Sequence, residues 1–162
     1  MPGDSSIKAG VHREKFEVAP VSSIWLPRLV EIDSSWNPAS WSVKLFEREL
    51  INPASRVRGL FRGNTLVGYL CAHVVMDEAH IVSLGIDPVW RRQGGGNELL
   101  RDFLRLCRLE NVLHVTLEVR VSNQAAQALY AQAGFKAAGI RKHYYSDNGE
   151  DAITMRYTVE MP

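Results

Sequence analysis

Short runs in which apolar and polar residues alternate recur along the chain and predict β-strands. We expect strands at residues 16–18, 57–61, 66–75, 79–86, 112–121, 135–145 and 152–159. Val115, Leu117 and Val119 fall on one face of their run, because successive side chains of a strand point to opposite sides. Gly63-Asn64 and Asp77-Glu78 separate consecutive runs and predict tight turns, so this part of the chain should form an antiparallel meander.

Other stretches carry apolar residues three and four positions apart, which predicts amphipathic helices. Their candidate caps or starting points are Ser22 or Ser23, Ser40, the glycines at 94–96, and Asn123. The expected inner faces are Ile24, Trp25, Leu29 and Ile32; Trp41, Leu45, Phe46 and Leu50; Leu99, Leu100, Phe103, Leu104 and Cys107; and Ala126, Leu129, Tyr130 and Ala133. Asn52-Pro53 and Gly134 are expected to end the second and the last of these helices.

A strand, a helix and another strand follow one another in the middle of the chain, between the meanders. This order predicts an α/β (α+β) protein in which helices flank one mixed, mostly antiparallel sheet. The length of 162 residues suits one domain with a substantial core. We expect that domain at 16–162, preceded by a mobile tail at 1–15, where no period is present.

Composition narrows the possible partners. The net charge of +1 gives no global basic field, so direct nucleic-acid binding is not expected. No apolar run approaches the roughly 20 residues of a membrane span, and the polar N-terminus has no signal-peptide core. We therefore expect a cytoplasmic protein without a membrane partner, present as a monomer or a weak dimer.

The cysteines and histidines do not predict a metal site. Cys71 and Cys107 lie in a predicted strand and a predicted helix, and we expect both to be buried free thiols. Neither cysteine has another cysteine or a histidine at metal-ligand spacing. The histidines are scattered, among them His73, His80, His114 and His143, so no metal is expected.

The stretch 82–100 has the clearest candidate chemistry, because an apolar strand leads through a basic turn and three glycines into a helix. A helix start offers unpaired N–H groups and partial positive charge to an anion. Arg91 and Arg92 add fixed positive charge. A Rossmann fingerprint is excluded because Leu99 stands where the third glycine belongs, and a P-loop because Asn97-Glu98 replaces the Lys-Ser/Thr pair. A turn that merely connects the strand to the helix is the alternative.

What remains is Arg91-x-x-Gly94-x-Gly96, which resembles the pyrophosphate-binding signature of the GNAT superfamily of acetyl-CoA-dependent N-acetyltransferases. Further stretches resemble the ribosomal-protein-alanine N-acetyltransferases, the RimI type of GNAT enzyme. They are Ser40 to Ser42, Asp87-Pro88, Leu117 to Asn123, Ala128 to Tyr130, Gly134-Phe135, Arg141 to Tyr145 and Glu150 to Ala152. Related N-terminal and lysine acetyltransferases share several of these pieces. Gly95 departs mildly from the pattern, since an aliphatic residue is usual there, and extra flexibility is expected at that position.

The resemblance implies the GNAT (acyl-CoA N-acyltransferase) fold and a pair of catalytic residues. An N-terminal amine, with a pKa near 8, must lose a proton before it attacks a thioester, and the leaving thiolate is helped by an acid. The resemblance assigns the base to Glu118, commonly acting through water, and the acid to Tyr130, facing the coenzyme sulfur. The alternatives are a Glu118 carboxylate paired with Arg120 or another cation, and a core tyrosine with its hydroxyl satisfied.

The resemblance also assigns residues to the two substrates. Backbone groups of Leu84, Gly85 and Ile86 are expected along the pantetheine arm. Asn123 is expected to contact the coenzyme, with a plain helix cap as a compatible alternative. The pyrophosphate site is expected at Arg91, Arg92, Gln93, Gly94, Gly95, Gly96 and Asn97. The acceptor cleft is expected at Trp41, Tyr144 and Tyr145, the tyrosines having a paired-aromatic strand edge as the alternative.

The predicted function is therefore an acyltransferase reaction: transfer of the acetyl group of acetyl-CoA to the N-terminal α-amine of a protein. By resemblance, the expected acceptor is the N-terminal alanine of a small-subunit ribosomal protein. One alternative is a GNAT enzyme acting on a lysine side chain or a small amine. Another is a coenzyme-binding module that acts as a protein partner without turnover.

Overall fold

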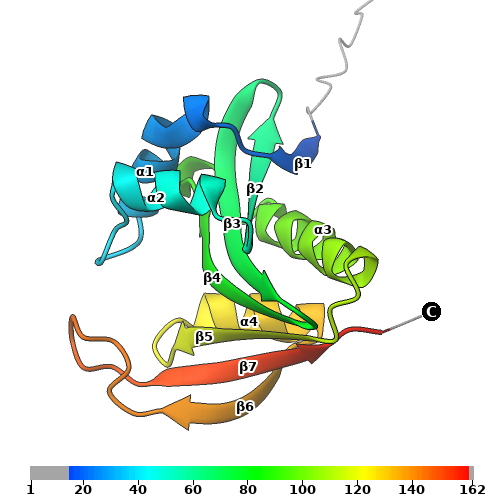
Figure 1. The fold of residues 1–162 in the computed structure, drawn as a ribbon. Coiled ribbons are helices and arrows are strands. Elements are labelled where there is room, and N and C mark those ends of the chain that lie inside the picture. The colour runs from blue at the N-terminus through cyan, green and yellow to red at the C-terminus, as the bar shows by residue number, and fades with distance from the viewer. Residues whose placement is uncertain (1–14, 161–162) are drawn as a thin grey trace, which may run out of the picture.

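The computed structural model describes residues 15–160, so the expected tail lies, apart from Lys15, outside the described residues. A strand forms within each of the predicted ranges, and Figure 1 shows their arrangement. In chain order the elements, with the two 3₁₀-helices written η, are β1 (Phe16–Pro20), η1 (Ser23–Trp25), α1 (Leu26–Ser34), α2 (Val43–Ile51), β2 (Ser55–Arg62), β3 (Thr65–Val75), β4 (Glu78–Ile86), η2 (Pro88–Trp90), α3 (Gly95–Leu109), β5 (His114–Arg120), α4 (Gln124–Ala133), β6 (Lys136–Arg141) and β7 (Ala152–Thr158).

The strands form one sheet in the order β1-β2-β3-β4-β5-β7-β6. Every neighbouring pair is antiparallel except β4 and β5, which run parallel, so the predicted mixed, mostly antiparallel sheet is confirmed. The parallel pairing joins only Glu78–His80 to His114–Thr116. Beyond it, β4 and β5 diverge, and Figure 1 shows β1 to β4 separated from β5 to β7 like the two sides of an open V.

A β-bulge lies in β4 just after the last residue that pairs with β5. Cys71 pairs with Ser83 and Ala72 pairs with Ile81, so Val82 has no opposite residue on β3. A bulge bends its strand and increases the local twist. This extra residue therefore helps β4 turn away from β5 at the place where the sheet opens.

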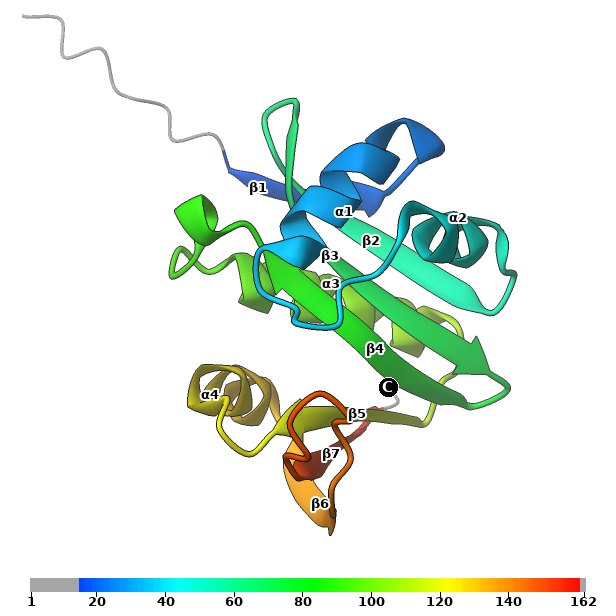
Figure 2. The same ribbon diagram turned by 90° about the vertical axis from the view of Figure 1, so that its left-hand side faces the viewer.

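Helices cover both faces of the first four strands, as Figures 1 and 2 show. On one face, Leu99 and Phe103 of α3 pack with Leu60 of β2 in the larger core. On the other face, α1 and α2 form a second core, in which Ile32 and Phe46 are fully buried. Burial on both faces explains why β3 is apolar almost throughout rather than strictly alternating.

The first two helices begin later than predicted. Ile24 is 79% exposed instead of lying on an inner face, because a 3₁₀ turn precedes α1 and changes the direction of the side chain. The cap of α2 is Ser42, whose hydroxyl accepts a hydrogen bond from the N–H of Leu45, and not Ser40. Trp41 consequently lies in the loop ahead of α2 rather than on the helix.

The strand predicted at 135–145 is wrong beyond Arg141, where β6 ends. His143 adopts a left-handed backbone conformation with φ of 52°, and its N–H donates to the carboxylate of Asp151 at 2.9 Å. Both features divert the chain from strand pairing, so Tyr144 and Tyr145 lie in the loop between β6 and β7. Among residues 15–160, no helix is long and apolar enough to cross a membrane.

Candidate active site

The opening between β4 and β5 forms a groove of about 1050 Å³. Its walls are β4, the glycine turn, β5, the start of α4, the loop ahead of α2, and Tyr145. It brings together the predicted residues Trp41, Leu84, Gly85, Ile86, Arg91, Arg92, Gly94, Gly95, Gly96, Asn97, Glu118, Asn123, Tyr130 and Tyr145. Gln93 and Tyr144 do not line it.

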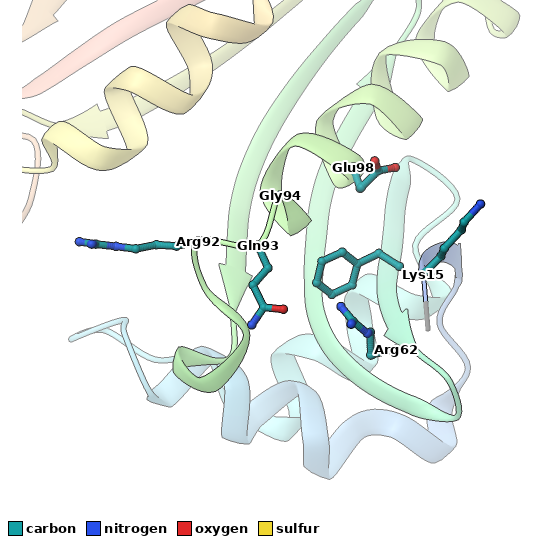
Figure 3. Close-up of a pocket in the computed structure, with 7 residues that line it drawn as sticks. Lys15, Arg62, Arg92, Gln93, Gly94 and Glu98 are labelled. Atoms are coloured by element: carbon teal, nitrogen blue, oxygen red, sulfur yellow. The ribbon is translucent and has the colours of Figure 1, made fainter. Parts of the chain in front are cut away.

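Gln93 instead lines a second cavity of about 810 Å³ beside the start of α3. Figure 3 shows Gln93 on the same side as Arg62, whereas the side chain of Arg92 extends away from them. Lys15 also lines this cavity, which is open to solvent and carries positive charge at its rim. The glycine turn thus has cavities on two sides, and the catalytic candidates lie only in the larger groove.

Ion pairing and capping order the turn that leads into the glycines. The Asp87 carboxylate accepts a hydrogen bond from the N–H of Val89 at 2.9 Å and pairs with Arg28 of α1. Burial raises the pKa of Asp87, but these contacts outweigh it and the pKa is lowered. Arg91 donates from Nε to the carbonyl of Ile86 at 3.1 Å, which holds its stem against the end of β4.

The three glycines serve different purposes. Gly94 has φ of 86°, a left-handed conformation that favours glycine, and open space surrounds the position of its missing Cβ. A Cβ on Gly95 would lie 2.6 Å from Cδ2 of Leu60, and one on Gly96 would lie 3.0 Å from Leu129. The absence of a Cβ at Gly95 therefore allows close packing of α3 on β2.

The first turn of α3 provides the donors that an anion needs. The first helical hydrogen bond of α3 runs from the N–H of Glu98 to the carbonyl of Gly94. The N–H groups of Gly95, Gly96 and Asn97 therefore precede the ladder, and these residues line the groove. Together with the helix dipole, this arrangement fits the pyrophosphate of a coenzyme.

Glu118 lies on the groove side of β5, with its side chain only 11% exposed. Its Oε2 is 2.5 Å from Nε2 of His80, and its Oε1 accepts a hydrogen bond from Arg141 at 3.2 Å. The cation pairing considered for this carboxylate thus exists, but the partners are His80 and Arg141 rather than Arg120. One carboxylate bonded to an imidazole on the neighbouring strand can accept a proton and be held in position for it.

Arg120 instead orders the loop between β6 and β7. It pairs with Asp147 at 2.9 Å and Glu150 at 3.4 Å, and its guanidinium lies 3.9 Å from the centre of the Tyr145 ring. Glu150 also accepts the N–H of Ser122, and hydrogen bonds from Ser122 lower the pKa of Glu150 to about 2. This cluster holds Tyr145 at the wall of the groove.

The paired tyrosines take different places. Burial raises the pKa of Tyr145 to about 12, although Arg120 acts in the opposite direction. Tyr144 is 42% exposed and packs edge-on against Tyr145, with ring centres 5.1 Å apart. The two rings do form an aromatic pair, but in a loop and not at a strand edge.

Tyr130 is 8% exposed and reaches the groove from α4. Its ring packs edge-on against Phe135 at 5.8 Å, and its hydroxyl makes no hydrogen bond to residues 15–160. Burial, and secondarily the neighbouring Tyr145, raises the pKa of Tyr130, so this phenol stays protonated. A neutral, unengaged hydroxyl at the groove is available as a proton donor.

Asn123 caps α4, since its Oδ1 accepts a hydrogen bond from the N–H of Ala126 at 3.1 Å. The plain helix-cap interpretation is therefore confirmed. Asn123 also lines the groove, so the cap does not remove it from the coenzyme candidates.

Sequence reasoning missed a buried polar cluster that holds the loop ahead of α2. Asp33 is fully buried and accepts hydrogen bonds from the Tyr69 hydroxyl and from the N–H of Trp41 at 2.6 Å. Tyr69 also bonds to Ser83 of β4 at 2.7 Å. The available signal was an aspartate four positions after Leu29, on the inner face of the predicted helix.

Trp36 and His80 were also missed. A Cβ on Gly85 would lie 2.2 Å from Nε1 of Trp36, so this indole lies directly against β4 at the groove. His80 meets Glu118 only because β4 pairs with β5. No pattern within either strand reveals such a contact.

Cys71 and Cys107 are buried free thiols, as predicted. Of the histidines, His73 lies with Cys71 and Glu49 in a cluster of possible metal ligands away from the groove. The cluster was missed because Glu49 comes from α2 and the other two residues come from β3.

Comparisons with known proteins agree with this fold. The model of the acetyltransferase (GNAT) family matches residues 26–135, and the chain belongs to this family. Among its relatives, the putative [ribosomal protein bS18]-alanine N-acetyltransferase of Bacillus subtilis is 38% identical over 135 residues, covering 83% of this chain and 89% of the relative. The [ribosomal protein bS18]-alanine N-acetyltransferase of Escherichia coli is 35% identical over 140 residues, covering 84% and 93%.

Solved structures place the chain in the same fold. The crystal structure of the ribosomal-protein-S18-alanine N-acetyltransferase from Escherichia coli aligns with a TM-score of 0.84 at 31% identity, covering 91% of this chain and 96% of that one. Arabidopsis thaliana NAA60 in complex with acetyl-CoA aligns with a TM-score of 0.83 at 17% identity, covering 90% and 99%, which shows the fold alone. The predicted GNAT fold is confirmed, and the chain is an acetyltransferase of this class.

Proposed function

We propose that this protein transfers the acetyl group of acetyl-CoA to the N-terminal α-amine of a protein, with the N-terminal alanine of ribosomal protein bS18 as the favoured acceptor. The observation that carries the proposal is the groove, where the Glu118 carboxylate, the unengaged Tyr130 hydroxyl and the start of α3 line one space. The acceptor rests on the names of the relatives from Bacillus subtilis and Escherichia coli. Such an acceptor would place the reaction in the cytoplasm.

The donor end of the groove fits acetyl-CoA. The N–H groups at the start of α3 and the nearby Arg91 and Arg92 would bind the pyrophosphate. Pairing of β4 with β5 stops at His80, so the edge of β4 at 84–86 offers backbone groups to the pantetheine arm, as an added strand would use them.

The reaction needs one proton acceptor and one proton donor. Glu118 would take the proton of the acceptor ammonium, directly or through a water, while His80 and Arg141 hold its carboxylate in place. The free amine would attack the thioester carbonyl, forming the C–N bond, and backbone N–H groups of β4 would stabilise the oxyanion. The C–S bond then breaks, Tyr130 would protonate the leaving sulfur, and the second proton that the attacking nitrogen must lose would pass through water to the Tyr130 oxygen, which restores the phenol.

Aromatic residues surround the acceptor end. Trp36 and Trp41 line the groove from the loop ahead of α2, and Tyr145 lines it from the loop between β6 and β7. A hydrogen bond from the N–H of Trp41 to the buried Asp33 holds the first loop. An ion pair between Arg120 of β5 and Asp147 holds the second. A short peptide N-terminus fits such a cleft better than a broad folded surface does.

Incubation with acetyl-CoA and peptides that begin with Ala, Ser or Met, followed by mass spectrometry, tests the proposal. We expect acetylation at the α-amine of the Ala peptide and a large loss of turnover in Glu118→Gln. Absence of turnover of the Ala peptide at every pH would refute the proposed acceptor. Preference for an internal lysine would assign a different acceptor, and unchanged turnover in Glu118→Gln would remove the base from the mechanism.

A further inference from the structure

A cluster of metal-ligand side chains lies outside the groove, where α2 covers β2 and β3. Cys71 and His73 are alternate residues of β3, so their side chains leave the strand on the same face. Glu49 of α2 faces them. One possible ligand atom from each of the three lies within 4.8 Å of the other two.

The distances are close to those of a metal site. The Oε2 of Glu49 is 2.8 Å from Nε2 of His73 and 3.7 Å from the sulfur of Cys71. Ligands about 2.0–2.3 Å from one tetrahedral Zn²⁺ lie roughly 3.4–3.6 Å from each other. Side-chain movements of less than about 1 Å would therefore place all three atoms around one ion.

The chemistry of the cluster is that of a zinc site. Thiolate, imidazole and carboxylate are the side-chain ligands that Zn²⁺ uses in proteins. Burial raises the pKa of Glu49, but hydrogen bonds from Ser55 and His73 outweigh it and the pKa is lowered. A Zn²⁺ ion bound beside Cys71 would stabilise the thiolate that acts as its ligand.

Access is also adequate. Cys71 is fully buried, whereas the side chain of His73 is 34% exposed, which opens one side of the cluster to solvent. That side leaves room for a water as a further ligand, and the hydroxyl of Ser55, which already donates to Glu49, lies close as an alternative.

We propose that Glu49, Cys71 and His73 bind one Zn²⁺ ion, with a water or the Ser55 hydroxyl completing a tetrahedral site. On binding, the Cys71 thiol releases its proton to the buffer and its sulfur bonds to the ion, with no change of oxidation state. The ion would join α2 to β3. Because α2 directly follows the loop that bears Trp36 and Trp41, this clamp would stabilise one wall of the groove without taking part in acetyl transfer.

Cobalt(II) titration of the full chain, purified without an affinity tag and stripped of metal, tests the proposal. We expect one Co²⁺ per chain, a sulfur-to-cobalt charge-transfer band in the near ultraviolet, and visible bands of tetrahedral intensity that disappear when Zn²⁺ is added. Cys71→Ala should abolish the charge-transfer band. Cys107→Ala is the matched control, because Cys107 is equally buried but lies in α3 away from the cluster, and it should retain the band.

A second measurement covers the case in which Cys71→Ala fails to fold. His73→Gln changes a partly exposed side chain and should weaken Co²⁺ binding about tenfold or more, the loss typical of even an outer-shell partner. Zn²⁺ at about one hundred times the wild-type Kd should raise the unfolding midpoint of the wild type by about 5 °C or more and that of His73→Gln by about half as much or less. Absence of the band in the wild type, its survival in Cys71→Ala, or its loss in Cys107→Ala would overturn the site.

Discussion

Replacing Tyr130 with phenylalanine should separate catalysis from folding at a single atom. The Tyr130 ring is buried against Phe135, and phenylalanine preserves that packing. The hydroxyl makes no hydrogen bond within residues 15–160, so its removal leaves no protein partner unsatisfied. The change therefore removes the proposed proton donor and little else.

The expected magnitudes differ between stability and rate. The free energy of unfolding should change by no more than about 0.5 kcal/mol, which is about 2 °C or less in Tm for a chain of this size. Loss of a general acid typically costs about 10²–10⁴ in rate, or roughly 3–5 kcal/mol of transition-state stabilisation. The Kd of the coenzyme should stay within about a factor of two or three, because the hydroxyl acts on the leaving group and not on the pyrophosphate.

Steady-state kinetics with an Ala peptide, a thermal unfolding scan and a coenzyme titration measure the three quantities. Tyr157→Phe is the matched control, since Tyr157 also packs against Phe135, at 5.4 Å, but does not line the groove. It should leave kcat unchanged. An unchanged kcat in Tyr130→Phe, or a fall in kcat matched by an equal loss of coenzyme affinity or by a large drop in Tm, would refute the assigned role.

Three further changes test other parts of the structure. Asp33→Asn replaces one of two buried carboxylate oxygens, which accept hydrogen bonds from the Tyr69 hydroxyl and the N–H of Trp41, with a donor group. It should destabilise the fold by about 1–3 kcal/mol and raise the KM for the peptide. Kinetics and thermal scans measure both effects, and a KM equal to that of the wild type would disprove the link to the loop. Gly95→Ala places a Cβ 2.6 Å from Leu60 and should cost about 1–3 kcal/mol of stability and weaken coenzyme binding. In the control Gly139→Ala the new Cβ has nothing within 4 Å, so this change should cost less than about 1 kcal/mol. Equal effects of the two variants on stability would contradict the packing argument. The pKa of Glu150 is lowered to about 2, so its carboxylate stabilises the fold fully above the unfolded pKa of about 4.3 and loses that contribution as the pH falls towards 2. Between about pH 6 and about pH 2, the Tm of Glu150→Gln should therefore fall less steeply than that of the wild type. Parallel curves of Tm against pH would rule the contribution out.

Local patterns were sufficient for most of the elements. Alternation predicted the strands, because a strand buries one face at a period of two residues whatever its neighbours are. The glycine turn and the Asn123 cap were likewise predictable, since a left-handed residue and a helix cap depend on only a few adjacent residues. The pattern was weakest at helix starts, where Ser42 rather than Ser40 caps α2, because several serines compete over a few positions.

The candidate site was only partly predictable. Its glycines, Glu118 and Tyr130 came from a resemblance of motifs, and the structure brings them to one groove. The partners of Glu118 could not be predicted, because His80 approaches it only through the short parallel pairing of β4 with β5. The loop at Tyr145 also escaped prediction, since the ion pairs of Arg120 that shape it join residues far apart in the chain.

The sequence by itself determined which segments form strands and helices, where the glycine turn lies and which chemistry the chain resembles. The tertiary structure alone decided that β4 and β5 separate after His80, that Asp33 anchors the tryptophan loop, and that Glu49 meets Cys71 and His73. The physical reason is the range of the interactions. Periodicity, caps and turns are set by neighbours within a few residues, whereas partners of buried polar groups are set by which elements pack together.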